Sequence, residues 1–212
     1  MNKNGFTLAE VLITLGVIGV VSAITMPTLI KNYQKQVTVN KLKKVYTTVS
    51  QAYEHSKLDN GEYINWGITT DSNPKEYVQK FWTPYLKTLK ECNTYQDCGY
   101  DKSMPWVNLQ GEVSYEDVTG TAVRHALILS DGTVLSFRIP PVAQVTNSAK
   151  INIDINGAKK PNKLCHDYFV MEITKEGKLR PLKLDNASES NQSTCLDKMI
   201  RDGWKIKDDY PW

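Results

Sequence analysis

Hydrophobic residues form one long uncharged run near the start of the chain. Residues 11–30 contain no charged side chain, and Glu10 stands at the edge of the run. A helix needs about 20 apolar residues to cross the hydrocarbon core of a bilayer. A carboxylate beside such a span is costly in lipid and by default marks a functional position. The pattern predicts a membrane-spanning helix that begins with a functional acid.

Beyond Pro27 the pattern becomes that of an amphipathic helix. Polar residues separate apolar positions at helical spacing, namely Val37, Leu42, Val45, Val49 and Ala52. We expect the helix to continue over residues 31–58 and to end at Asn60 and Gly61. Pro27 lacks a backbone N–H group and therefore predicts a kink within the helix.

Residues 59–212 have the pattern of an α+β domain. After a polar loop, residues 75–89 predict a short helix that Pro84 is placed to split. Residues 123–129 and 133–139 are rich in β-forming residues and flank an Asp-Gly pair, which is typical of a hairpin.

Further strands follow in the last third of the chain. Ile151, Ile153 and Ile155 alternate with polar residues and predict a half-buried strand. Residues 168–174 and 178–184 flank a Glu-Gly pair and predict a second hairpin. We expect an antiparallel sheet of four or five strands, packed on the second half of the long helix, and a short helix over residues 196–201. The fold class is therefore α+β, with a long N-terminal helix that spans a membrane in its first half.

The first residues resemble those of the type IV pilin family, which includes the pseudopilins of type II secretion. The resemblance rests on Gly5, on Phe6-Thr7-Leu8, on Glu10 and on the apolar helix that contains Pro27. It implies that a prepilin peptidase cuts between Gly5 and Phe6 and methylates the new amine of Phe6. It also implies a leader over residues 1–5, an assembly helix over residues 6–30 and a requirement for Glu10 in filament assembly. The implied partners are other subunits, the prepilin peptidase, an inner-membrane assembly platform and membrane lipid.

A physical role for Glu10 agrees with this resemblance. Glu10 lies four residues after Phe6, so the two positions share one face of the helix. A carboxylate at this depth needs a partner, and the amine of a neighbouring subunit's Phe6 would lower the cost of both charges. An ordinary signal peptide fits less well, because its apolar core is shorter and lacks such an acid. A single-pass anchor that is never processed is a second alternative.

Charge sets limits on location and on partners. The chain of 212 residues has 26 Lys and Arg against 23 Asp and Glu, a net charge of +3, which is weak support for nucleic-acid binding. The one basic cluster predicts a solvated or headgroup-facing helix surface, and it contains Lys31, Lys35, Lys41, Lys43 and Lys44. By charge alone, these lysines favour a cytoplasmic domain. The resemblance implies the opposite: an inner-membrane protein with an extracytoplasmic domain, which later enters a cell-surface or periplasmic filament.

Four cysteines favour that second orientation. An even number of cysteines outside the cytoplasm suggests disulfides, although four cysteines allow three pairings. We favour the pairs Cys92–Cys98 and Cys165–Cys195, and the alternative is free thiols in a reducing compartment.

One turn suggests a bound ion. Asp154, Asn156 and Asp167 offer oxygen ligands of the kind that Ca²⁺ prefers, and major pseudopilins carry calcium in a comparable late loop. The full calcium-loop pattern is absent, and Asn156 before Gly157 is also typical of a plain turn. No other cofactor is expected.

No motif for catalysis is present. Cys165 and His166 are adjacent, and adjacent strand residues point to opposite faces, so a nucleophile–base pair is awkward. We expect a structural filament subunit and not an enzyme. The alternative is a minor pilin that acts as a DNA- or surface-binding module at the filament tip, which a strongly basic exposed patch would support.

Overall fold

The computed structural model describes residues 5, 7–67, 73–102, 105–112, 124–139, 149–182 and 195–212. The chain divides into two compact units, residues 1–37 and residues 38–212. The helix α1 (Leu8–Asn60) contributes to both units and continues through Pro27 without interruption. It ends as expected, because Gly61 adopts a positive φ of 80° and donates its N–H group to the carbonyl oxygen of Lys57 at 2.9 Å.

The N-terminal part of α1 buries none of its side chains in the molecule. An 18-residue window of this helix has a mean hydropathy of 2.2 and is 0% buried. Its large apolar residues are all exposed, from Leu8 at 79% to Ile30 at 54%. Among the described residues, α1 is the one helix that is long and apolar enough to cross a membrane.

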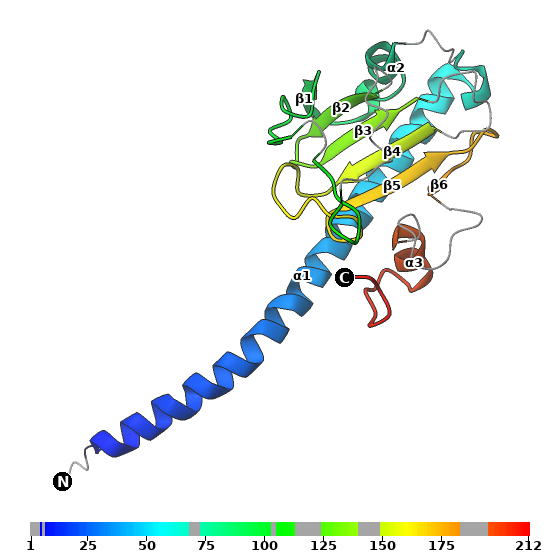
Figure 1. Ribbon diagram of the computed structural model, residues 1–212. Coiled ribbons are helices and arrows are strands. Elements are labelled where there is room, and N and C mark those ends of the chain that lie inside the picture. Colours follow the sequence, from blue (N-terminus) through cyan, green and yellow to red (C-terminus); the bar gives the residue numbers. More distant parts are fainter. Residues whose placement is uncertain are drawn as a thin grey trace. The chain divides into compact units, whose positions relative to one another are not determined.

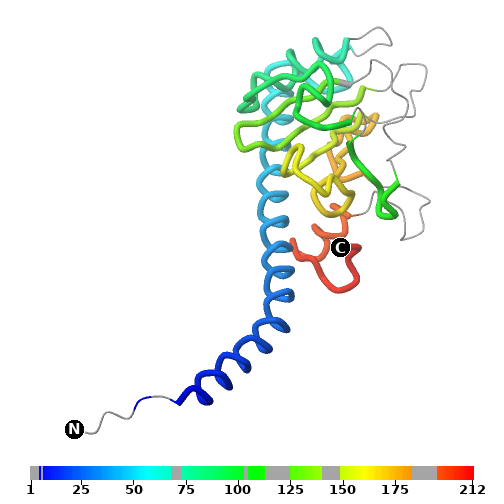
Figure 2. The backbone as a smooth tube through the Cα atoms, turned by 60° about the vertical axis from the view of Figure 1, so that its left-hand side comes forward, coloured from blue at the N-terminus to red at the C-terminus, as the bar shows by residue number. Residues whose placement is uncertain are grey.

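The C-terminal part of α1 has a buried face. The buried residues recur three or four positions apart and are Val39, Leu42, Val45, Val49, Ala52, Tyr53 and Ser56. Figures 1 and 2 show this part of the helix running along one face of the sheet. The amphipathic pattern is thereby confirmed, and its apolar positions pack on the sheet.

Short elements lead from α1 to the sheet. They are η1 (Tyr63–Asn65), α2 (Pro74–Phe81), η2 (Thr83–Tyr85) and β1 (Thr88–Cys92). Asn73 caps α2 by accepting a hydrogen bond from the N–H group of Lys75 at 2.9 Å. The predicted helix over residues 75–89 is wrong at its C-terminal end, since Leu89 lies in β1 and is 70% exposed.

The sheet is a six-stranded antiparallel meander. After β1 come β2 (Arg124–Leu129), β3 (Val134–Arg138), β4 (Ala149–Asp154), β5 (Tyr168–Ile173) and β6 (Leu179–Pro181), and each strand pairs with the next. Both predicted hairpins are present, with positive φ angles at Gly132 and Gly177 in their turns. The expected count of four or five strands was too low because β1 was assigned to a helix. The helix α3 (Cys195–Arg201) follows the sheet.

Both faces of the sheet are covered, so the expectation of a half-buried β4 is wrong. Ile151 and Ile153 lie on one face, while Asn152 and Asp154 lie on the other and are only 4% and 0% exposed. The segment after β1 covers this second face. Trp106 stacks on Tyr168 with ring centroids 4.8 Å apart, and the hydroxyl of Tyr95 lies 2.8 Å from that of Ser136.

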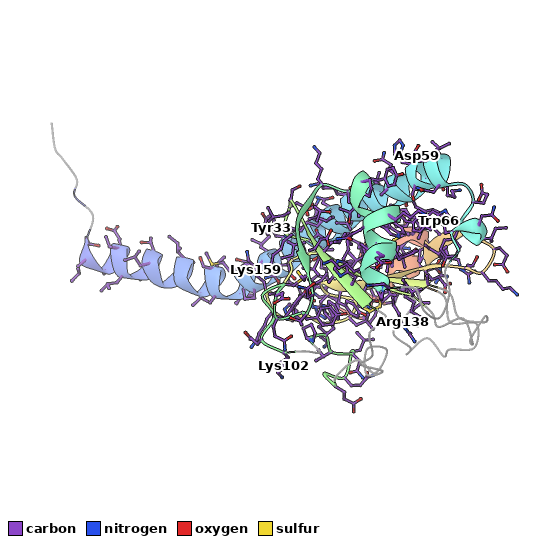
Figure 3. All side chains as sticks on the ribbon, turned by 90° about the horizontal axis from the view of Figure 1, so that it is seen from above. Tyr33, Asp59, Trp66, Lys102, Arg138 and Lys159 are labelled. Carbon is purple, nitrogen blue, oxygen red and sulfur yellow. A yellow bond between two sulfur atoms is a disulfide. The ribbon has the colours of Figure 1, made fainter. Side chains whose placement is uncertain are left out.

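The helix face of the sheet is held by aromatic side chains. Tyr53 of α1 stacks on Trp82, which packs against Phe137 of β3 at 4.8 Å. Trp66, labelled in Figure 3, stacks on Phe81 of α2 at 4.3 Å. The domain therefore has an aromatic core that joins α1, α2 and the sheet.

Candidate functional site

The N-terminus of α1 is organised by a reciprocal pair of hydrogen bonds. One carboxylate oxygen of Glu10, Oε2, accepts from the backbone N–H of Thr7 at 2.8 Å and from its hydroxyl at 2.8 Å. In return, the N–H group of Glu10 donates to Oγ1 of Thr7 at 3.2 Å. This is a capping box, in which two N–H groups without helical partners are satisfied.

The capping box leaves part of Glu10 available. Among the described residues, Thr7 supplies every hydrogen bond to this carboxylate, and all of them go to Oε2. The other oxygen, Oε1, can therefore accept a hydrogen bond from a group outside the chain. Sequence reasoning missed the part played by Thr7, although the pattern Thr-x-x-Glu could have revealed it.

The predicted cleavage position lies just before this cap. Gly5 is exposed, and a Cβ atom added there would meet nothing within 4 Å. Packing within the molecule therefore does not explain why a glycine stands at this position. Phe6, the predicted site of methylation, lies outside the described residues.

The four cysteines form two disulfide bonds in the domain. Cys92 is bonded to Cys98, and Cys165 is bonded to Cys195, each with 5.5 Å between Cα atoms. The first bridge closes a short loop after β1. The second joins the loop before β5 to α3. Cys165 is therefore no thiol nucleophile, and the ring of His166 stacks on Trp212 at 4.8 Å.

The structure brings Asp154, Asn156 and Asp167 together in one polar cluster. The backbone N–H of Asn156 donates to Asp154 Oδ1 at 3.2 Å, and its side-chain amide donates to Asp167 Oδ2 at 3.1 Å. Burial and, to a smaller extent, the nearby charge of Asp167 raise the pKa of Asp154 to about 7. Burial also raises the pKa of Asp167. Asn156 thus bridges two buried carboxyl groups.

Hydrogen-bond donors already surround both carboxyl groups. Tyr100 and Trp106 donate to Asp154 Oδ2 at 2.9 and 2.8 Å, from the segment that covers this face of the sheet. The backbone N–H groups of Asn162 and Lys163 donate to Asp167 at 2.9 and 2.6 Å. A cation would have to displace these donors. In the described part of the chain, no group of three or more His, Cys, Asp or Glu side chains could hold a metal ion.

Comparison with known families identifies the class of the N-terminal segment. Residues 1–26 match the prokaryotic N-terminal methylation motif, which is the prepilin-type cleavage and methylation signal of type IV pilins and pseudopilins. The chain is therefore a pilin- or pseudopilin-type substrate of prepilin peptidase, and the motif indicates a structural protein that assembles with other pilin subunits.

A second family model matches most of the domain. Residues 28–177, more than half of the chain, match a family described as a family of unknown function, DUF6613, and the chain belongs to that family. No curated protein and no solved structure matches the chain.

Proposed function

We propose that the chain is a structural subunit of a type IV pilus-like or type II secretion pseudopilus filament. The observation that carries this proposal is the N-terminal part of α1. Its most apolar stretch of 18 residues is 0% buried, and the acid Glu10 caps the start of the helix. Exposed apolar surface of this extent needs lipid or other apolar helices around it. In the membrane lipid supplies that surrounding, and in a filament the helices of neighbouring subunits do.

Glu10 would set the position of each subunit against the next. After cleavage behind Gly5, the amine of Phe6 carries a positive charge at the start of the helix. In apolar surroundings, an amine and a carboxylate from adjacent subunits stabilise each other. Oε1 of Glu10, to which no described residue donates, can accept from that amine while Oε2 remains in the capping box with Thr7.

The disulfides support a domain outside the cytoplasm. Structural disulfides persist in oxidising compartments and are rare in the cytosol. The N-terminal motif and the apolar helix fit a membrane-anchored N-terminus with a C-terminal domain. We place the subunit first in the inner membrane, in contact with the assembly platform, and then in the filament.

Glu10→Gln provides the sharpest test, because glutamine also completes a capping box but carries no charge. Filaments are counted by electron microscopy, and the mature N-terminus is analysed by mass spectrometry. We expect the variant to be cut after Gly5 and methylated at Phe6, yet to form no filaments. Glu54→Gln is the matched control, because Glu54 is an exposed acid of the same helix. Wild-type filament numbers in Glu10→Gln would refute the assembly role.

The alternative, a DNA-binding tip subunit, needs a strongly basic exposed patch. The clearest basic feature of the sheet is a cross-strand row in which Arg124 pairs with Arg138, Arg138 with Lys150, Lys150 with Glu172 and Glu172 with Arg180. Glu172 is 4% exposed and accepts from Arg180 Nε at 2.7 Å. Arg138 and Lys150 are half-buried. The row includes a buried acid, and the side chains described in it are half-buried or buried rather than exposed, so we favour the structural subunit.

A further inference from the structure

Three side chains suited to a membrane surface directly follow the apolar run of α1. Lys31 is exposed, Tyr33 is 70% exposed and Lys35 is half-buried, and all three belong to the first compact unit. Lys31 and Lys35 are one helical turn apart and share a face, while Tyr33 lies on the opposite side. Figure 3 labels Tyr33 on the helix. All three lie within about 6 Å along the helix axis, directly after the apolar run.

The two lysines have no acidic neighbour along the helix. No Asp or Glu occurs between Glu10 and Glu54. Two other lysines of the basic cluster have partners within the domain: Lys44 pairs with Asp131 at 2.9 Å, and Lys43 lies over the ring of Trp204 at 6.0 Å. Among the described residues, no acidic side chain pairs with Lys31 or Lys35, and of the basic cluster these two lysines lie nearest the apolar run.

Helix geometry places these residues at a defined depth. Residues 11–30 rise about 30 Å at 1.5 Å per residue, which matches the roughly 30 Å hydrocarbon core of a bilayer. Lys31 then lies at the boundary between the hydrocarbon core and the headgroups. Lys35 lies about 6 Å farther out, in the headgroup layer. Tyr side chains are enriched at that layer, and Lys side chains reach it with their ammonium groups.

We infer that Lys31, Tyr33 and Lys35 form a collar that binds the anionic phospholipid headgroups of the leaflet on the domain side. The inference rests on the proposed function, because the apolar part of α1 must span a bilayer. It also accounts for lysines that stand on the side of the span where they are usually depleted. Anionic headgroups provide the counter-charge that the helix lacks.

The test measures lipid selectivity of the full chain. The purified protein is reconstituted into phosphatidylcholine vesicles that contain either spin-labelled phosphatidylglycerol or spin-labelled phosphatidylcholine, and electron paramagnetic resonance gives the motionally restricted fraction of each. A lysine near an anionic surface contributes about fivefold in affinity. We expect severalfold selectivity for phosphatidylglycerol at low salt, which screening reduces at high salt.

Charge-matched variants decide the outcome. Lys31→Gln with Lys35→Gln should remove most of the selectivity, and Lys31→Arg with Lys35→Arg should keep it. Lys102→Gln with Lys205→Gln is the control, since both are exposed lysines of the domain and their loss changes the net charge equally. A wild-type chain without selectivity, or a Lys31→Gln, Lys35→Gln variant that keeps it, would overturn the collar but leave the filament proposal intact. A chain whose helix does not span the vesicle membrane would contradict both.

Discussion

Residues 8–30 and residues 38–60 belong to the same helix, yet the two stretches depend on different surroundings. The first buries no side chain within the molecule, and the second buries seven. Both are regular helix, so backbone hydrogen bonds do not distinguish them. The difference lies in the spacing of their apolar residues, which is continuous in the first stretch and periodic in the second. A helix with an apolar surface all round has its partners outside the chain, whereas an amphipathic helix has them within its own fold.

The largest expected difference in stability is between two Leu→Ala substitutions, one in each stretch. Leu42 is 0% exposed, and Leu42→Ala should lower the free energy of unfolding of the domain by about 2–5 kcal/mol. Leu15 is 60% exposed, and Leu15→Ala should leave that energy unchanged. Guanidinium titration of the full chain in detergent, followed by tryptophan fluorescence, measures both. Equal losses would contradict the separation of the two stretches.

Removing each disulfide tests how much that bond contributes to the stability of the domain. The bridge Cys165–Cys195 spans 30 positions and Cys92–Cys98 spans 6. Chain-entropy estimates give losses of about 3.6 kcal/mol and about 2.2 kcal/mol on replacing each pair by serine. The same titration gives the two values. A larger loss for the shorter loop would show that the bridges do not act mainly through the unfolded chain.

The polar cluster predicts a dependence of stability on pH. In the folded domain, burial raises the pKa of Asp154 from 3.8 to about 7. Between about pH 4 and pH 7 the folded state therefore keeps a proton that the unfolded state has lost, and the stabilisation present at low pH declines as pH rises. We expect this group to cost up to about 1.4 kcal/mol of stability for each pH unit within the window. Asp154→Asn should flatten the profile, and an unchanged slope would exclude Asp154 as its source.

A smaller effect compares two tyrosines of α1. The hydroxyl of Tyr53 donates to the carbonyl oxygen of Gly177 at 2.7 Å, which links the helix to the turn between β5 and β6. Tyr53→Phe should cost about 1 kcal/mol of unfolding free energy. Tyr33→Phe, in the stretch without partners in the domain, should cost nothing measurable. Thermal unfolding of the two variants side by side provides the comparison.

The smallest expected effect concerns calcium. The carboxylates of Asp154 and Asp167 accept hydrogen bonds from protein donors, so the domain needs no cation to satisfy them. We expect the same melting temperature in calcium and in chelator. A rise in calcium would instead support the sequence-based site at Asp154, Asn156 and Asp167.

Local pattern was sufficient to predict the elements that it alone determines. The apolar run, the amphipathic repeat and the two glycine turns predicted α1, both hairpins and α3. β1 was missed because Leu89 and Lys90 are both exposed, and the strand is defined by pairing with β2 rather than by its own alternation. Such a strand exists through tertiary contact, which local propensity does not encode.

The candidate site shows the same limit. A charge beside an apolar run was enough to single out Glu10, and one short segment, residues 154–167, contained all three members of the polar cluster. Tyr100 and Trp106, which donate to Asp154 from 54 and 48 positions away, could not be assigned to it. Their segment covers the second face of the sheet without any periodic pattern. Long-range hydrogen bonds of this kind follow from the fold and not from spacing.

The bond between Tyr53 and Gly177 has a consequence for biosynthesis. Its two ends are 124 positions apart, and the ribosome makes the helix first. At a translation rate of about 5–20 residues per second, the strands that cover the buried face of α1 are made roughly 6–25 s after the helix. During that delay Leu42, Val49 and their neighbours are open to solvent and to other nascent chains. The helix that the ribosome makes early is therefore buried on this face only after most of the chain has been made.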